Sequence, residues 1–351
     1  MPQVRPRICE AVALAGLWVL ATLVHGQNPA LPRERLVPES APAERSLARD
    51  QTLLFVGDVM LSRGVGAKMK AAGEWAYPFQ KIGPTLAAAE LAISNLECPI
   101  SDLGHNRHHL YSFRADPRSL EGLKSAGFDV VWAANNHMYD WGPEALLDTL
   151  RRLREAGILT VGAGANDLEA HYPLLMDLAG TKLAFLAYVD IEPKGAIAGP
   201  DKPGVAWLEP DRVLADIRFA RRLADLVTVG LHWGIEYVSR PQRGQVELAH
   251  QMIDAGADLV VGSHPHVVQP VEQYHSRWIV YSLGNFIFDQ KPGATRRGLM
   301  LKVTLQNKQI AEVTTIPITI EPSLQAVITP RKTSDQVSTH GTLKPNSIRG
   351  Q

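Results

Sequence analysis

Residues 52–60 read TLLFVGDVM, a short apolar run that ends in glycine and aspartate before two further apolar residues. A run of this length, closed by the turn signal Gly57, predicts a buried β-strand. Asp58 then stands at the carboxyl end of that strand, which is where ligands bind in open α/β sheets. The same pairing of a buried strand with a polar residue at its end recurs along the chain, and it decides the fold.

Short apolar runs alternate with helical patterns from about residue 51 to residue 321, which is typical of βαβ units around a largely parallel or mixed sheet. We expect strands at 52–56, 91–94, 129–133, 158–161, 182–189, 226–231, 258–261, 278–282, 299–305 and 310–318. Helices are expected at 79–90, 117–126, 143–156, 211–225 and 245–255. No helix separates the last two strands, so the sheet should end in antiparallel pairs. The sequence therefore predicts one α/β domain.

Polar side chains stand at the carboxyl ends of five expected strands and form the candidate site. In chain order they are Asp58, then Asn95 and Glu97, then Asn136, His137 and Asp140, then His232 and Glu236, and last His264 and His266. In an extended segment, His264 and His266 would present both imidazoles to one point. Imidazole, carboxylate and amide groups without a thiolate suit Mn²⁺, Fe or Zn²⁺. They are numerous enough for two ions that share one carboxylate.

Each motif by itself also has a plainer explanation. A Gly-Asp pair after a strand is a common turn, and a single Asn-His pair is often a cap. Asn285 either lines the cleft or belongs to a β-turn, and the sequence favours neither. Coincidence at five strand ends is a poor explanation, however, so the metal site is the hypothesis that we retain.

The charge balance excludes one class of function. The 351 residues carry 36 Lys and Arg against 36 Asp and Glu, with no block of five like charges. A nucleic-acid binder would show a basic surplus or a basic block, and this chain shows neither. If the protein handles a polyanion, the attraction must be local and come from metal ions at the strand ends.

The N-terminus predicts export. Arg5 and Arg7 precede an apolar run at 11–24, and Val24-His25-Gly26 then offers small residues at the positions that a signal peptidase reads. We expect a secretory signal peptide at 1–26 and a location in the periplasm or at the outer face of the membrane. The alternative is an uncleaved anchor, which the length of the run disfavours because a spanning helix needs about 20 apolar residues.

The remaining boundaries follow from composition. Residues 27–50 are rich in Pro, Arg, Glu and Ala and predict a disordered tether, 51–321 form the domain, and 322–351 predict a polar, disordered tail. Cys9 departs with the signal peptide, so Cys98 is expected to be a buried, unpaired thiol.

Six linked motifs resemble the CapA capsule-synthesis family (poly-γ-glutamate biosynthesis, PgsA-like), which is similar to calcineurin-like metallophosphoesterases. The motifs are GDVML at 57–61, NLE at 95–97, ANNH at 134–137 with Asp140 and Gly142, HWG at 232–234 with Glu236 and Tyr237, GSHPH at 262–266, and SLGNF at 282–286. The resemblance covers about residues 52–321. It implies a four-layer α/β/β/α sandwich with mixed sheets around two divalent metal ions, in a cell-envelope protein associated with a capsule polymer.

The resemblance also implies roles for single residues. It makes metal ligands of Asp58, Glu97, Asn136, His232, His264 and His266. His137 matches the histidine that protonates the leaving group in phosphoesterases, with Asp140 as the acidic neighbour that orients it. Asn95, Glu236 and Asn285 are expected to line the cleft. Phosphoesterases have Asp-x-His at the first strand where this chain has Met60, a poor ligand for a hard ion, so one metal position should be built differently.

Two classes of function follow from these observations. One is a phosphoesterase-like hydrolase in which two ions activate water against an anionic capsule polymer or ester. The other is a non-catalytic accessory subunit that holds or exports a polyanionic capsule chain within a membrane-bound synthesis complex. The chain has no Gly-rich Walker loop that ends in Lys-Ser or Lys-Thr, so it does not itself supply an ATP-dependent ligase.

Overall fold

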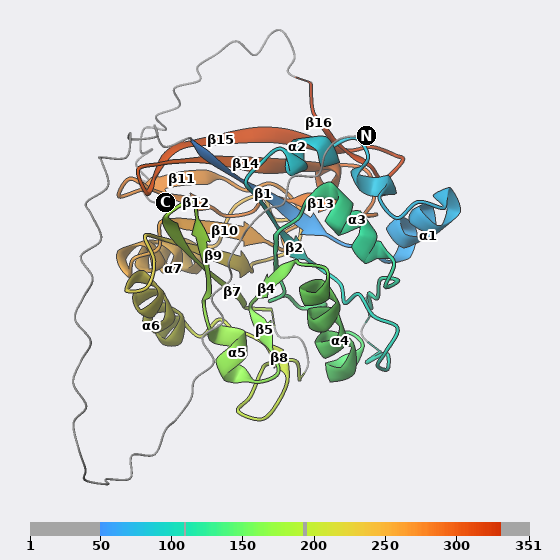
Figure 1. Cartoon of the computed structure of the whole chain (residues 1–351), viewed down its shortest axis with the longest axis horizontal. Coiled ribbons are helices and arrows are strands. Elements are labelled where there is room, and N and C mark those ends of the chain that lie inside the picture. The colour runs from blue at the N-terminus through green and yellow to red at the C-terminus, as the bar shows by residue number, and fades with distance from the viewer. Residues whose placement is uncertain (1–49, 109, 192–194, 331–351) are drawn as a thin grey trace, which may run out of the picture.

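Two β-sheets form the centre of the computed structural model, which describes residues 50–108, 110–191 and 195–330 (Figure 1). The first sheet has the strand order β16-β15-β14-β1-β2-β3-β4, and β13 also pairs with β1. Its strands are β1 (Gln51–Val59), β2 (Leu91–Leu96), β3 (Val130–Trp132), β4 (Leu159–Val161), β13 (Asn285–Ile287), β14 (Arg297–Gln306), β15 (Gln309–Ile320) and β16 (Ala326–Ile328). Strands β1 to β4 are parallel, and β14 to β16 extend the sheet with antiparallel pairs.

The second sheet has the order β11-β12-β10-β9-β7-β6. Its strands are β6 (Leu174–Leu178), β7 (Thr181–Val189), β9 (Leu226–His232), β10 (Leu259–Ser263), β11 (Val271–Tyr274) and β12 (Arg277–Val280). The four inner strands are parallel and the two edge strands are antiparallel. A short pair, β5 (Ala163–Gly164) and β8 (Gly204–Val205), lies outside both sheets.

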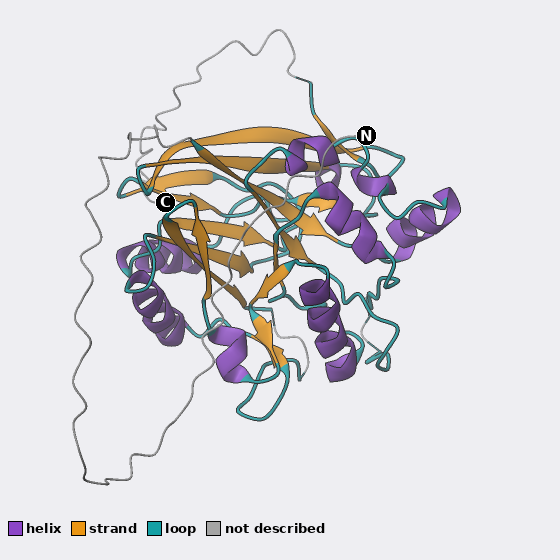
Figure 2. Ribbon diagram, in the orientation of Figure 1, coloured by secondary structure: helices purple, strands orange, loops and turns teal. Residues whose placement is uncertain are grey.

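Helices cover the outer face of each sheet (Figure 2). The helices α6 (Pro210–Arg221) and α7 (Arg243–Asp254) pack on β7, β9 and β10. On the first sheet, α2 (Gly83–Ala87) packs on β2 and α4 (Gly142–Glu155) on β4. The remaining helical segments are α1 (Arg63–Ala72), α3 (Ser119–Ala126), α5 (Asp167–His171) and the 3₁₀ turns η1 (Tyr77–Phe79) and η2 (Ala294–Arg296). The expected four-layer α/β/β/α sandwich is confirmed.

Aromatic side chains join the two sheets. The ring of Trp132 on β3 lies 6.1 Å from the ring of Phe55 on β1 and 6.1 Å from that of Phe185 on β7. Gly230 on β9 makes room for the indole, since a Cβ there would lie 2.6 Å from a Trp132 ring atom. A second apolar cluster fills the space between the second sheet and its helices α6 and α7.

The expected strands are all present with shifted ends, whereas one expected helix is wrong. In place of a helix over 79–90 the chain forms η1 and the short α2. Pro78 and Pro84 sit in the first turns of these two segments, and a helix cannot continue through a proline without losing a backbone hydrogen bond. Helix α1 was not expected because Gly64 and Gly66 lower its helix propensity.

The domain also extends beyond the expected boundary at residue 321. Strand β16 pairs with β15 through residues 326–328, so the sheet continues where we placed the start of a polar tail. The expected signal peptide at 1–26, residues 27–49 of the tether, and residues 331–351 lie outside the described residues. Within the described ranges, no helix has the length and apolar character needed to cross a membrane.

Candidate metal centre

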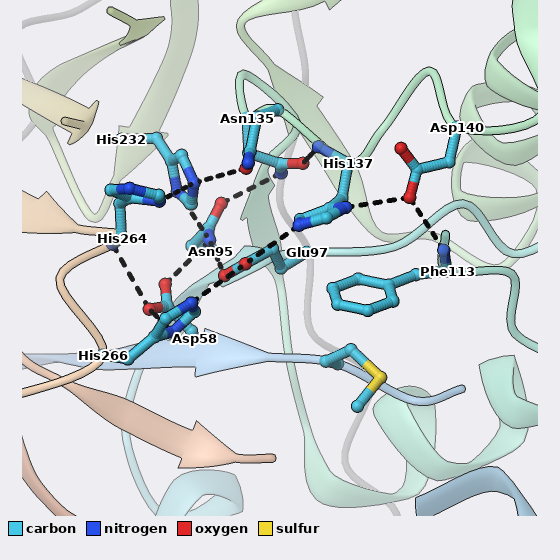
Figure 3. Close-up of polar contacts among 12 residues, drawn as sticks. Asp58, Asn95, Glu97, Phe113, Asn135, His137, Asp140, His232, His264 and His266 are labelled. Atoms are coloured by element: carbon cyan, nitrogen blue, oxygen red, sulfur yellow. Dashed lines mark hydrogen bonds and ion pairs between the residues drawn. The ribbon is translucent and has the colours of Figure 1, made fainter. Parts of the chain in front are cut away.

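The carboxyl ends of strands from both sheets meet at one buried cluster (Figure 3). The first sheet contributes Asp58 from β1, Asn95 from β2, Glu97 just after β2, and the turn of residues 135–137 after β3. The second sheet contributes His232 at the end of β9, and His264 and His266 follow β10. Most of these side chains are buried, Asn136 is half-buried, and Glu236 is exposed. All the sequence-predicted ligands therefore come from the ends of parallel strands.

Two carboxylates lie at the centre of the cluster, and both are completely buried. The Nδ2 group of Asn95 donates to Asp58 Oδ1 at 2.8 Å and to Glu97 Oε2 at 3.3 Å. Burial, and next the charge of Asp58, raise the pKa of Glu97 well above its usual range. Glu97 Oε1 has no hydrogen-bond partner among the described residues. In the described part of the chain, neither carboxylate pairs with a lysine or arginine.

This unbalanced pair of carboxylates fits a bound cation, because buried charges are stable only when they are paired or coordinate a metal. The oxygens of Asp58 and Glu97 lie with a ring nitrogen of His266 in a group whose ligand atoms are all within 4.8 Å of one another. A second group of the same compactness joins His266 to His264 and Glu236. The shared member of the two groups is His266, whereas Glu97 belongs to the first group alone.

Three imidazoles border the carboxylates. His232 Nε2 lies 3.1 Å from His264 Nδ1 and 2.9 Å from Asn136 Oδ1. Burial, with smaller effects from His266 and His137, lowers the pKa of His264 to about 3. Burial also lowers the pKa of His232 well below its usual range. Both rings are therefore neutral at physiological pH, which is the form that binds metal.

The local backbone differs from the expectation for His264 and His266. Their φ angles are 93° and 57°, so the segment is not extended and the two rings do not meet by strand alternation. A bend after β10 brings the ring centroids to 5.7 Å instead. A positive φ is strained for residues other than glycine and persists only where the surroundings impose it. The expected convergence is thus present, but its physical cause was wrong.

His137 is hydrogen-bonded to Asp140. Its Nδ1 donates to Asp140 Oδ2 at 2.8 Å, while Nε2 lies 4.0 Å from Glu97 Oε1. Asn135 shapes the turn, since its Oδ1 accepts the backbone N–H groups of His137 and Met138. The imidazole therefore has one nitrogen bound to a carboxylate and the other directed at the metal-ligand cluster.

Met60 stands where the family resemblance would place a ligand histidine, and its side chain makes a different contact. The Met60 thioether is buried and accepts a hydrogen bond from the Ser62 hydroxyl at 3.0 Å. It belongs to neither of the compact ligand groups. Asn285, left open by the sequence, lies in the site, because its Oδ1 is 2.9 Å from His266 Nδ1.

Comparison with known proteins identifies the family. The family model described as "Bacterial capsule synthesis protein PGA_cap" matches residues 52–290. The chain belongs to this family. The capsule biosynthesis protein CapA of Bacillus anthracis is 34% identical over 290 residues, which are 80% of this chain and 70% of that protein. The PGA biosynthesis protein CapA of Bacillus subtilis is 34% identical over 280 residues, covering 78% of this chain and 73% of that protein.

A third relative of this PGA_cap-family chain is a probable polyglutamine synthesis accessory protein of Mycobacterium tuberculosis, 31% identical over 79% of this chain and 76% of that protein. Among solved structures, a 5'-nucleotidase precursor from Thermus thermophilus has a TM-score of 0.44 and 12% identity, over 80% of this chain and 54% of that one. The NAD nucleotidase of Haemophilus influenzae also has a TM-score of 0.44 and 12% identity, over 80% of this chain and 60% of that one.

A pocket of about 550 Å³ opens over the buried cluster of candidate ligands. His137, His266 and Glu236 line it together with the aromatic residues Tyr111, Phe113, Tyr237 and Phe288. Arg63 and Lys291 supply positive charge, although Arg63 is ion-paired with Asp289. A second cavity of about 590 Å³ also has Tyr237 and Ala294 in its lining.

The sequence did not predict the roles of Glu236 and Phe113 in this PGA_cap protein. Glu236 was expected to line the cleft; it lines the pocket, and a carboxylate oxygen also lies within 4.8 Å of ring nitrogens of His264 and His266. Phe113 contacts His137 from a loop that has no metal-binding motif. The sequence could have indicated Phe113 only as an aromatic residue within a polar loop.

Proposed function

We propose that this PGA_cap-family protein is an exported, metal-dependent hydrolase that acts on an anionic ester or polymer end in capsule or poly-γ-glutamate biosynthesis. The observation that carries the proposal is His137, a histidine hydrogen-bonded to a carboxylate at 2.8 Å in the lining of a pocket, beside a buried cluster of side chains that could hold a metal. Histidine-carboxylate pairs also occur at His171–Asp216 and His250–Glu272, but of these three histidines only His137 lines this pocket, where a general acid could reach a substrate.

The residues divide into two metal positions. Asp58, Glu97 and His266 would hold one divalent ion, and Glu236 and His264 would hold a second beside the same His266. His232 lies against His264 of the second group, and Asn136 lies against His232. A bound pair of divalent ions supplies Lewis-acid chemistry, which lowers the pKa of water and neutralises charge on an oxyanion.

The protein's own groups supply orientation and a proton. Asn95 holds Asp58 and Glu97 in place through its amide. His137 donates a proton from Nε2 to the departing oxygen, while Asp140 keeps Nδ1 as a donor and stabilises the charged imidazole before transfer. Lys291, which makes no ion pair with another described residue, attracts the anionic substrate into the pocket. The second cavity beside Tyr237 offers space for further units of a polymer.

The location and partners belong to the same proposal. The expected signal peptide would place the protein in the periplasm or at the outer face of the membrane, either free or through an uncleaved anchor. There it would meet the anionic polymer or ester, with a membrane-bound capsule synthesis complex as its partner. The balance of 36 basic and 36 acidic residues argues against nucleic acid as a substrate.

Turnover of an aryl phosphate by the purified protein with Mn²⁺ tests the hydrolase. We expect His137→Ala to lower kcat by about 100-fold, within the usual range for loss of a general acid, while His250→Ala on α7, outside the site, keeps wild-type activity. If His137→Ala leaves turnover unchanged, the general-acid role is wrong.

Elemental analysis tests the metal centre separately from turnover. Purified wild-type protein should contain divalent metal, and His264→Ala should contain less, while His250→Ala serves as the matched histidine control. Equal metal content in wild type and His264→Ala would contradict the ligand assignment.

One observation favours a second candidate, the non-catalytic accessory subunit that holds or exports a polyanionic capsule chain. Met60 offers no ligand where phosphoesterases have a histidine, and its thioether is bonded to Ser62. Ions at such a site would act as a cationic anchor. Metal-dependent binding of an anionic polymer without turnover of any aryl phosphate would favour this candidate over the hydrolase.

A further inference from the structure

Phe113 contacts both members of the histidine-carboxylate pair. Its backbone N–H donates to Asp140 Oδ2 at 2.7 Å, the same oxygen that accepts His137 Nδ1 at 2.8 Å. Its ring lies against the His137 imidazole with centroids 3.9 Å apart and planes inclined by 28° (Figure 3). One residue therefore holds the carboxylate through its backbone and the imidazole through its ring.

These two contacts restrict different motions of His137. The hydrogen bond to Asp140 fixes where Nδ1 lies, but it permits the imidazole to swing about that nitrogen. A flat aromatic surface at 3.9 Å fixes the plane of the imidazole. With both in place, Nε2 is held toward Glu97 and the pocket.

The loop that carries Phe113 is docked on the turn that carries Asp140. The backbone N–H of Arg107 donates to the Asp140 carbonyl at 2.9 Å, and that of His105 to the Trp141 carbonyl at 3.0 Å. The Phe113 ring is itself confined, because Phe288 meets it edge-on at 5.9 Å and the Arg63 guanidinium lies over it at 4.6 Å. These packing contacts and the backbone hydrogen bonds of the loop thus hold the Phe113 ring against His137.

We propose that Phe113 is a positioning residue that holds His137 in its proton-donating orientation. This inference rests on the proposed function in that it takes His137 as the proton donor. A general acid matters most when the leaving group is poor, since a good leaving group departs without a proton. Loss of the Phe113 ring should therefore slow reactions with poor leaving groups selectively.

The kinetic test compares phenyl phosphate, a poor leaving group, with 2,4-dinitrophenyl phosphate, a good one, both with Mn²⁺. We expect Phe113→Leu to lower kcat for phenyl phosphate about tenfold or more, a part of the usual contribution of a general acid, and to leave the dinitrophenyl rate nearly unchanged. Phe113→Tyr, which keeps the ring, should retain most of the phenyl phosphate rate. Phe79→Leu is the matched control, because Phe79 is as deeply buried but packs on Phe128.

A spectroscopic test is independent of turnover. The His137 Nδ1 proton, bonded to a carboxylate, should give a downfield NMR resonance that is absent in His137→Gln. We expect this resonance to be lost or to exchange faster in Phe113→Leu and to persist in Phe79→Leu and Phe113→Tyr.

The two tests separate failure of this inference from failure of the proposed function. Equal slowing of both substrates by Phe113→Leu, or persistence of the downfield resonance in that variant, overturns the positioning role. If wild-type protein hydrolyses neither substrate, the hydrolase proposal fails, and the resonance in Phe113→Leu still decides whether Phe113 positions the imidazole.

Discussion

At residue 140, one carboxylate oxygen receives hydrogen bonds from the His137 imidazole and from the Phe113 backbone. The carboxylate can only accept, so it selects the imidazole form that carries its proton on Nδ1. An amide at this position could present its NH₂ group instead and would no longer impose that form.

We therefore expect Asp140→Asn to lower kcat for phenyl phosphate about 100-fold or more, a typical loss when the partner of a catalytic histidine is removed. The metal content should stay at the wild-type level, because Asp140 is in neither compact ligand group. Steady-state kinetics and elemental analysis on one preparation measure kcat and the metal content. Asp148→Asn, which changes another buried carboxylate with arginine partners, is the control, and equal kinetic losses in the two variants would contradict the assignment.

At the scale of elements, the contact between the two sheets depends on one small residue opposite one large residue. Gly230 on β9 faces the Trp132 indole on β3, and the indole in turn contacts aromatic rings from both sheets. Parallel strands that are buried on both faces leave no free side for a displaced side chain.

Gly230→Ala should destabilise the fold by about 1–3 kcal/mol, the usual cost of overpacking a core. The physical reason is that the new methyl group would meet the indole at 2.6 Å. Urea denaturation followed by fluorescence or circular dichroism measures the change. In a Trp132→Leu background, Gly230→Ala should cost less stability, since the smaller leucine leaves room for the new methyl group. If the destabilisations by the two substitutions simply add, the indole is not the obstacle.

Helices α5 and α6 are linked by an ion pair that should respond to pH. Arg212 donates two hydrogen bonds of 2.7 Å to the Asp167 carboxylate. The hydrogen bonds from Arg212 hold the pKa of Asp167 below its usual value. Because the folded-state pKa is lowered, the stabilisation is present above the pKa of about 3.9 for a free aspartate and is lost as pH falls through the lower folded value.

A double-mutant cycle with Asp167→Asn and Arg212→Gln measures this ion pair. At pH 7 we expect a coupling free energy of up to about 1 kcal/mol, since both side chains are partly exposed to solvent. At a pH below the folded pKa the coupling should fall to near zero. The cycle removes the separate contribution of His171, which lies 3.8 Å from Asp167. Coupling that grows in acid would have the wrong sign for this mechanism.

At the scale of the whole molecule, the candidate metal centre lies where the two sheets meet. Asp58 and Glu97 come from the first sheet, and His264 and His266 from the second. An ion bound by members of both sets would therefore tie the sheets together, in addition to neutralising the two buried carboxylates.

Removal of metal with EDTA should accordingly lower the melting temperature by several °C, and Mn²⁺ should restore it. Ligand present at 100 times its Kd stabilises a fold by about 2.7 kcal/mol. Calorimetry or a thermal-shift assay measures the difference. His264→Ala should show a smaller metal-dependent shift, whereas His250→Ala should keep the wild-type shift. An identical melting temperature with and without metal would argue against an ion at this interface.

Much of the site could be predicted from local sequence. A buried apolar run followed by Asp58, or by His264 and His266, specifies a strand and a polar end within a few residues. Parallel strands then bring their carboxyl ends to one edge of the sheet. The polar residues at these ends were therefore expected to form a cluster. Helix α1 and the broken helix at 79–90 were missed, because glycine and proline act there through local conformation that apolar periodicity does not reveal.

The amino-acid sequence alone thus determined the family, the α/β architecture and which residues are candidate ligands, because residue identity and short-range spacing carry that information. Only the tertiary structure decided that Phe113 supports His137, that Glu236 approaches His264, and that β16 completes the first sheet. The first two depend on contacts between separate loops, whereas β16 pairs with the strand just before it, in a stretch whose polar composition gave no strand signal. The contacts between loops arise from packing of the whole chain, and no local pattern of residues encodes them.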